Sequence, residues 1–99
     1  MRVYKFIIGA TKFSWRYPRL RGKATGWCYF EDKKILIDSR LRNRKRLECE
    51  IHEYIHAAYP DLSEESVTCS AYNLAVILWN LGYRHSSDAE NPKTREPDQ

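Results

Sequence analysis

Two histidines and a glutamate at residues 52–56 carry the clearest chemical signal in this sequence. Residues i and i+4 of a helix lie on one face, so His52 and His56 can hold a single metal ion between their rings. Glu53 lies beside them, within reach of a metal-bound water. Zinc accepts imidazole nitrogen and, where one coordination position stays open, lowers the pKa of bound water to about 7. The motif therefore predicts a zinc site that supplies hydroxide at neutral pH.

A carboxylate on the next predicted helix can complete this site. With 3.6 residues per turn, Glu64 falls on the same helix face as the small residues Ala71 and Ala75, opposite a polar face. An inward carboxylate without a partner would cost several kcal/mol, and a zinc ion supplies that partner. Glu65 points about 100° away and fits the ordinary role of a first-turn glutamate at the positive end of the helix dipole. We predict Glu64 as the third ligand, with Glu65 as the alternative.

The residues before the motif predict a small sheet. Residues 2–9 are rich in β-branched and aromatic side chains and predict a strand. Residues 26–30 and 34–38 predict a hairpin with a polar turn between them. Residues 10–24 are ambiguous and fit a short helix followed by a loop.

Two helices follow the predicted hairpin. The first begins near Asn43, a good N-cap residue, and runs to about Ala58, because Pro60 forbids its continuation. The second starts after Ser63 and ends before Gly82, a typical C′ residue. The expected apolar stripe of the first helix comprises Leu47, Ile51, Ile55 and Ala58.

The order of elements predicts an α+β fold in one domain, residues 1–84. A short antiparallel sheet of about three strands would pack on the helix that carries the motif and on the following glutamate-bearing helix. Residues 85–99 are polar and hold two prolines, so we expect a disordered tail.

Residues 52–56 match the HExxH motif of the zincin metallopeptidases, and a glutamate on the following helix is similar to the gluzincin branch. The chain resembles the single-domain minigluzincins and short phage and prokaryotic HExxH proteins over roughly residues 26–84. The resemblance implies a zincin-like fold, with His52, His56 and Glu64 as zinc ligands and Glu53 as general base. It also implies hydrolysis of peptide bonds by a zinc-bound water.

Two positions depart from the family pattern. Thr68 stands where an acid often orients a histidine, and Leu62 stands where the metzincin branch has its third histidine. Gluzincins usually add a tyrosine or histidine that stabilises the oxyanion. The residues that could take this role here are Tyr72, Tyr83 and His85.

The expected partner of a peptidase is an extended peptide or protein segment. We predict that strand 34–38, as an edge strand, binds it by β-addition. No apolar run approaches the roughly 20 residues that a bilayer crossing needs, and no signal peptide is evident, so we expect a cytoplasmic protein without membrane contact. The three cysteines fit reduced thiols, although Cys49 lies one turn before His52 and could contact the metal.

Uneven charge supports a rival function. Residues 1–47 carry a net charge of +11 and residues 48–99 a net charge of −7. Two solvated faces of one fold explain this, but so does a nucleic-acid-binding module with a structural or vestigial zinc site. A second rival is a structural zinc protein that has lost catalysis, with its site closed by Cys49 or Cys69. A third alternative is hydrolysis of a non-peptide amide. The nucleic-acid interface would use the cations Arg16, Arg19, Arg21, Lys23, Arg40, Arg42, Arg44, Lys45 and Arg46 and the aromatic residues Trp15, Tyr17 and Trp27.

Overall fold

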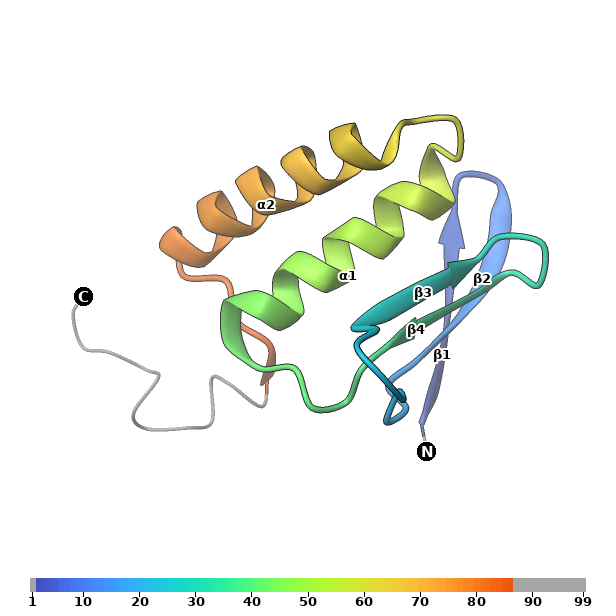
Figure 1. Ribbon diagram of the computed structural model, residues 1–99, viewed down its shortest axis with the longest axis horizontal. Coiled ribbons are helices and arrows are strands. Elements are labelled where there is room, and N and C mark those ends of the chain that lie inside the picture. Colours follow the sequence, from blue (N-terminus) through green and yellow to red (C-terminus); the bar gives the residue numbers. More distant parts are fainter. Residues whose placement is uncertain (1, 87–99) are drawn as a thin grey trace.

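Residues 2–86 are described by the computed structural model, which has four strands followed by two helices. The strands are β1 (Val3–Ile8), β2 (Thr11–Arg16), β3 (Gly26–Tyr29) and β4 (Lys34–Ile37), and the helices are α1 (Asn43–Ala58) and α2 (Glu64–Asn80). Both helices lie on one face of the sheet, α1 against the strands and α2 along α1 (Figure 1). The predicted α+β class and single domain are confirmed.

The sheet is mixed, with strand order β1-β2-β4-β3. β1 and β2 form an antiparallel hairpin whose turn contains Gly9 at φ 64°, a left-handed conformation that glycine adopts without steric cost. β3 and β4 form a second antiparallel hairpin. The two hairpins join through a parallel pairing of β2 with β4, in which Trp15 is opposite Ile35.

The expected three-stranded antiparallel sheet is therefore wrong in strand number and in one pairing. The missing strand is β2, within the segment 10–24 that fits a short helix equally well by composition. The alternation of buried and more exposed side chains along β2 has a period of two residues, not 3.6. Phe13 and Trp15 are buried, whereas Lys12 is exposed. Gly9 turns the chain back on itself instead of ending the sheet.

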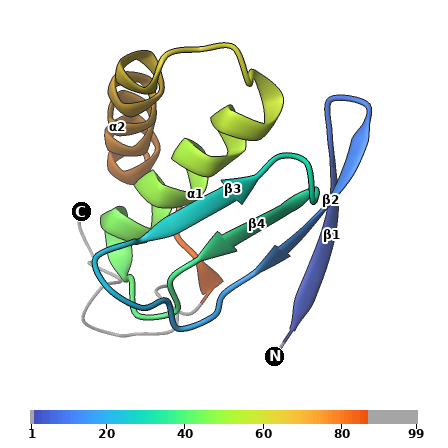
Figure 2. The same ribbon diagram turned by 45° about the vertical axis from the view of Figure 1, so that its right-hand side comes forward.

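The added strand also changes which strands form the edges of the sheet. β4 lies between β2 and β3, so segment 34–38 is not an edge strand, and the prediction that it binds a peptide by β-addition is wrong. The edge strands are β1 and β3. β3 is the edge strand beside α1 (Figure 2).

The core fills the space between the sheet and α1. Buried apolar side chains from the sheet meet Cys49 and Ala57 of α1. On the other side of α1, the helix–helix contact uses Val67, Ala71 and Ala75 of α2, which have no exposed surface. The two alanines have short side chains and let the helices approach closely. The sheet contributes Ile8, Phe13, Trp15, Ile35 and Ile37 to the core.

Helix ends follow the sequence signals in most respects. The Ser63 side chain accepts a hydrogen bond from the backbone N–H of Ser66 at 3.1 Å and caps α2. Gly82, at φ 99°, follows the C-cap of α2 as predicted. The N-cap of α1 is Arg42 rather than Asn43, and Asn43 itself takes a left-handed φ of 58°, which asparagine tolerates better than most residues.

The buried face of α1 differs from the predicted apolar stripe. Leu47, Ile51, Ile55 and Ala58 are only half-buried. The most buried residues are Arg46, Cys49, Glu53 and Ala57, because the helix lies between two partners and its sheet-facing side carries polar groups. Neither helix among residues 2–86 has the length and apolar character needed to span a membrane.

The expected boundary at residue 84 needs one adjustment. His85 stacks edge-to-face on Tyr17, with ring centroids 6.3 Å apart, so it packs on the domain. The remainder of the predicted tail, from residue 87 onward, lies outside the described residues.

Candidate metal centre

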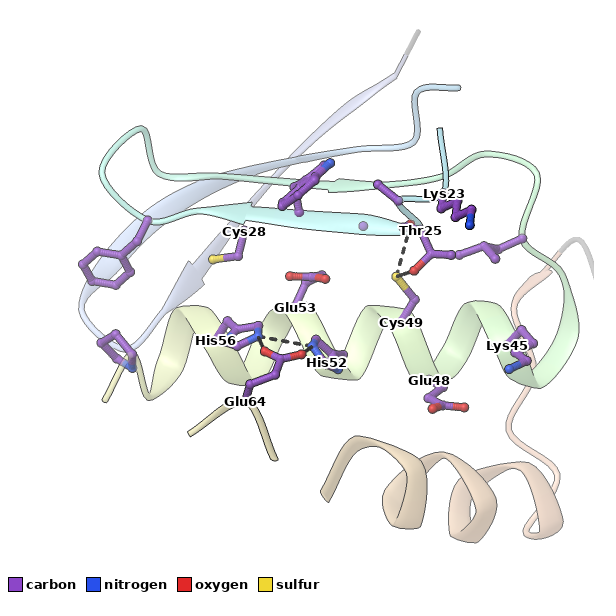
Figure 3. Close-up of a pocket in the computed structure, with 16 residues that line it drawn as sticks. Lys23, Thr25, Cys28, Lys45, Glu48, Cys49, His52, Glu53, His56 and Glu64 are labelled. Carbon is purple, nitrogen blue, oxygen red and sulfur yellow. Dashed lines mark hydrogen bonds and ion pairs between the residues drawn. The ribbon is translucent and has the colours of Figure 1, made fainter. Parts of the chain in front are cut away.

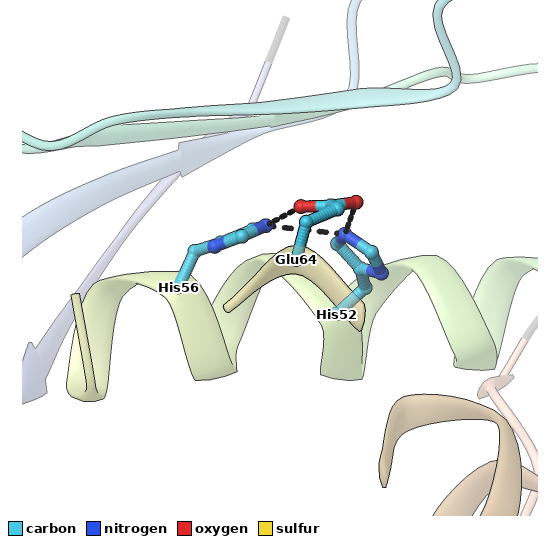
Figure 4. A group of neighbouring side chains, drawn as sticks. All are labelled: His52, His56 and Glu64. Carbon is cyan, nitrogen blue, oxygen red and sulfur yellow. Dashed lines mark hydrogen bonds and ion pairs between the residues drawn. The ribbon is translucent and has the colours of Figure 1, made fainter. Parts of the chain in front are cut away.

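Two successive turns of α1 bring the histidines of the motif together. The ring centroids of His52 and His56 are 4.8 Å apart, and their Nε2 atoms are 3.2 Å apart (Figure 4). Both rings are half-buried on the side of α1 where α2 begins. The i, i+4 spacing therefore places two nitrogen donors at one point, as predicted.

The start of α2 supplies the third donor. A short turn after α1 leads to Ser63, and Glu64 begins α2 directly above the two rings (Figure 4). Glu64 Oε2 lies 3.1 Å from His52 Nε2, and Oε1 lies 2.9 Å from His56 Nε2. These three side chains are close enough to bind one metal ion.

The separations fit a tetrahedral zinc ion. Ligand atoms about 2.0–2.1 Å from zinc lie about 3.3 Å from each other at a tetrahedral angle. The two Nε2 atoms are 3.2 Å apart, and each lies 2.9–3.1 Å from a different Glu64 oxygen, so the three side chains surround a space of about that size. Two imidazoles and one carboxylate are also a donor set that zinc accepts, with one position left for a further ligand.

Glu64, rather than Glu65, is the acid beside the histidines, but the reason given from the helical wheel is wrong. The Glu64 side chain is 69% exposed, so it does not lie at the centre of a buried face. Glu64 is the first residue of α2 and reaches the two rings from there, on the N-terminal side of the buried contact made by Ala71 and Ala75. Thr68 donates a hydrogen bond of 3.4 Å to Glu64 Oε2, which places a hydroxyl where the resemblance expects an acid.

Glu53 points from α1 toward β3 into the same cleft (Figure 3). The residue is only 7% exposed, and no described residue donates a hydrogen bond to its carboxylate, whose oxygens still reach the cleft. Burial, reinforced by the charge of Glu64, raises the pKa of Glu53 to about 7. A buried carboxylate without a protein partner is uncommon outside functional sites.

Gly26 allows this close approach of strand and helix. A Cβ at Gly26 would lie 2.6 Å from Cys49 Sγ and 3.1 Å from Glu53 Oε2, and also 3.1 Å from the backbone oxygen of Leu36. Nothing larger than glycine fits without displacing one of them. The sequence signal was a glycine at the start of a short strand, which often marks close backbone approach.

The cleft that contains these groups has a volume of about 660 Å³ and runs along α1 beneath β3. His56 lies toward one end (Figure 3), and Pro60 and Phe30 also line the cleft. The other end has Lys23 from the loop before β3 and Lys45 from the first turns of α1, both exposed and neither in an ion pair with another described residue (Figure 3). This end was not anticipated from the sequence.

The cysteines do not contribute donors to the three-residue cluster. Cys49 donates its thiol hydrogen to the Thr25 carbonyl at 3.3 Å, which joins α1 to the loop before β3. Burial raises its pKa to about 12. Cys28 also lines the cleft, and burial raises its pKa to about 11. Cys69 is exposed on α2, so a closed site completed by Cys49 or Cys69 has no support in this geometry.

None of the three residues expected to stabilise an oxyanion lines the cleft. Tyr72 is exposed on α2 and stacks with the guanidinium of Arg44, 5.6 Å from the ring centroid. Tyr83 and His85 follow α2 and line a separate cavity. Because α2 begins beside the histidines and runs away from them, Tyr72, Tyr83 and His85 lie away from the metal donors.

The expected nucleic-acid interface is also divided by the fold. Trp15 and Tyr17 face the helices, and the Tyr17 hydroxyl donates a 2.6 Å hydrogen bond to Glu50. Trp27 is 48% exposed and points to the other face of the sheet. Arg46 is buried, and Arg40 is bound to Asp38 at 2.6 Å. The predicted cations and aromatic residues thus do not form one surface.

Comparisons with known proteins add no relative: no protein-family model, no curated protein and no solved structure matches this chain.

Proposed function

We propose that this protein is a zinc-dependent peptidase, with His52, His56 and Glu64 as metal ligands and Glu53 as the general base. One observation carries the proposal: a buried carboxylate without a protein hydrogen-bond partner shares a cleft with three converging metal donors. The resemblance of residues 52–56 to the HExxH motif of metallopeptidases also supports a peptidase. A structural zinc site would not need such a carboxylate.

Zinc bound by these three side chains would lower the pKa of water and polarise a substrate carbonyl. Glu53 accepts a proton from the attacking water, whose oxygen forms a bond to the carbonyl carbon. The C–N bond then breaks, and Glu53 returns the proton to the departing amine nitrogen. Atoms balance, because the acid product gains the water oxygen and the amine gains the proton.

The substrate best suited to the cleft is an extended peptide. β3 pairs with β4 on one side only, so its other edge has backbone groups available for β-addition. This edge borders the cleft that contains Glu53 and the histidines. A peptide along β3 would lie across the site with its backbone fixed by the strand. This proposal replaces the earlier assignment of the peptide to segment 34–38.

Lys23 and Lys45 at one end of the cleft favour a carboxylate on the substrate, and they outnumber Glu48, the acid that lines the cleft one turn after Lys45. Lys45 precedes Glu53 by eight residues, which is about 12 Å along a helix at 1.5 Å per residue. An extended peptide covers that distance in three to four residues. The peptidase proposal therefore includes a preference for an acidic side chain or a free C-terminus about that far from the cleaved bond.

The decisive experiment is digestion of a proteome-derived peptide library by zinc-loaded wild type and by Glu53→Gln. Loss of Glu53 should reduce cleavage at least about a hundredfold while zinc content stays the same. Glu65→Gln is the matched control, because it removes a neighbouring acid outside the cleft. Equal cleavage by wild type and Glu53→Gln would remove Glu53 from the reaction, and absence of cleavage by zinc-loaded wild type would refute the peptidase.

A further inference from the structure

The face of the sheet opposite the helices is uncovered among residues 2–86. α1 and α2 both lie on the other face (Figures 1 and 2). The strand registers place alternate side chains of all four strands on this outer face. The outer face comprises Val3, Lys5, Ile7, Lys12, Ser14, Arg16, Trp27, Tyr29, Lys34 and Leu36.

The charges on the outer face have one sign. It contains four cations, Lys5, Lys12, Arg16 and Lys34, and no acid. None of the four forms an ion pair with another residue in the described range. Acidic residues of the chain are concentrated elsewhere, mainly on and after α1. The outer face therefore presents an uncompensated positive potential to an anionic partner.

Two aromatic rings stand side by side on the same face. Trp27 is 48% exposed and Tyr29 is 40% exposed, although rings of this size usually bury most of their surface. Their centroids are 6.1 Å apart, with an angle of 34° between the ring planes. Lys34 is opposite Tyr29 in the register, and its Nζ lies 5.1 Å from the centroid of that ring. The aromatic pair thus lies directly beside a cation.

We propose that the outer face binds single-stranded nucleic acid. Exposed aromatic rings on an open sheet can stack with unpaired bases, and the neighbouring cations can contact the phosphates. A duplex offers the phosphates but keeps its bases stacked on each other, so it cannot use Trp27 and Tyr29. An acidic protein would use the cations but would not need two adjacent exposed rings. Both features together favour a single strand.

This surface lies across the sheet from the metal centre, and Trp27 is the one residue of the outer face that also lines the cleft. His52, His56 and Glu64 project from the helices on the opposite side of the sheet. Binding of nucleic acid therefore does not depend on zinc or on peptide hydrolysis, and the two proposals can fail independently.

The test measures fluorescence anisotropy of labelled oligothymidylate and oligouridylate of about 12 nucleotides, within the usual site sizes for single-strand binding. Wild type should bind both, with log K falling by about 0.7 per contacted phosphate for each unit of log salt concentration. Trp27→Ala with Tyr29→Ala should weaken binding at least about tenfold. Lys34→Ala should make the salt slope about 0.7 shallower.

Matched variants separate stacking from general loss of structure or charge. Trp27→Phe keeps an aromatic ring and should retain most of the affinity. Tyr72→Ala removes an exposed ring from α2, and Lys45→Ala removes a cation from the cleft; both should bind like wild type. His52→Ala, which removes a proposed zinc ligand, should also bind like wild type. Circular dichroism checks that each variant is folded.

Four outcomes would overturn the proposal. The first is absence of an anisotropy change with wild type at low salt, and the second is unchanged affinity in the Trp27→Ala, Tyr29→Ala double variant. The third is equal or tighter binding to a blunt duplex of the same length. The fourth is binding to phosphatidylserine vesicles, or self-association in sedimentation, with no oligonucleotide binding. The first outcome would show that the protein does not bind a single strand, the second that it binds elsewhere than at the outer face, and the last two would assign the outer face to a different partner.

Discussion

Gly26 of β3 lies directly against the carboxylate of Glu53 on α1, with its missing Cβ position 3.1 Å from Glu53 Oε2. The same position is 2.6 Å from Cys49 Sγ, so glycine here fixes how closely the strand and the helix approach. The absence of one methyl group thus determines where the proposed general base lies.

Gly26→Ala should impair both stability and hydrolysis. The added methyl group clashes with Cys49 Sγ, and overpacking of this kind typically costs about 1–3 kcal/mol. It also moves the Glu53 carboxylate, so the rate per folded molecule should fall at least about tenfold. Thermal unfolding gives the first effect and peptide cleavage gives the second.

Gly22→Ala is the control for backbone strain. Gly22 has φ 69° but no atom near its missing Cβ, so alanine there should lower stability without changing the rate of the folded protein. If Gly26→Ala behaved like Gly22→Ala, Gly26 would have no role in positioning Glu53.

Removal of any one of the three metal donors should weaken zinc binding. His52→Ala, His56→Ala and Glu64→Ala each delete one of the atoms that converge within 4.8 Å. Affinity should fall at least about tenfold, since even indirect partners of zinc ligands contribute 10–100-fold. Zinc content by mass spectrometry after dialysis against a competing chelator measures the effect.

Glu65→Ala provides the control, because Glu65 is an adjacent acid outside the cluster. Its zinc content should equal that of wild type. Full zinc retention by Glu64→Ala, with loss in Glu65→Ala, would show that the acid ligand is the other glutamate.

Lys23 and Lys45 should determine which peptides are cleaved fastest. Lys23→Ala with Lys45→Ala removes the two exposed cations at one end of the cleft. We expect several-fold lower kcat/KM for peptides with a carboxylate three to four residues from the cleaved bond, and little change for neutral peptides. Peptides with an amidated C-terminus distinguish a terminal carboxylate from an acidic side chain. An equal decrease for acidic and neutral peptides would argue against a carboxylate site.

The positions of the histidines could be predicted because they depend on one helix. His52 and His56 are four residues apart and lie well inside the helix predicted over about residues 43–58, which Pro60 ends. The structure places Glu64, not Glu65, beside the two rings, and its role as a ligand stays a prediction. Its exposure was not predictable, because the distance between α1 and α2 depends on packing that a helical wheel does not contain.

The peptide-binding strand could not be predicted because strand order is a long-range property. Segment 34–38 has the sequence of a good strand, but its position depends on whether β2 pairs with it. That pairing joins residues about 20 apart in the chain. Gly26 had a recognisable signal, yet its contact with Glu53 requires knowing that α1 packs directly on β3.

The three thiols should react at different rates in the folded protein. Cys69 is exposed, whereas burial raises the pKa of Cys49 to about 12 and of Cys28 to about 11. Thiolate is the reactive form, so near pH 8 iodoacetamide should modify Cys69 first and Cys49 last. Peptide mapping of a labelling time course measures this order. Equal rates at all three sites in native protein, as in urea, would contradict the buried positions of Cys28 and Cys49.

Asp38 should make the protein sensitive to acid. Asp38 is 4% exposed at the end of β4 and accepts hydrogen bonds from the Arg40 side chain, at 2.6 Å from Nη2, and from the Arg40 backbone N–H at 3.0 Å. These hydrogen bonds, with the charge of Arg40 and against the effect of burial, hold the pKa of Asp38 at about 2. The unfolded chain has a pKa of about 3.9 at this position. Because the folded-state pKa is the lower one, the stabilisation is complete above about pH 4 and is lost as the pH falls toward 2.

Asp38→Asn removes the titrating group, so the difference in Tm between wild type and this variant should be constant from pH 7 to about 5 and shrink by about pH 2. A difference that stayed the same over the whole range would show that the charge of Asp38 does not contribute to stability.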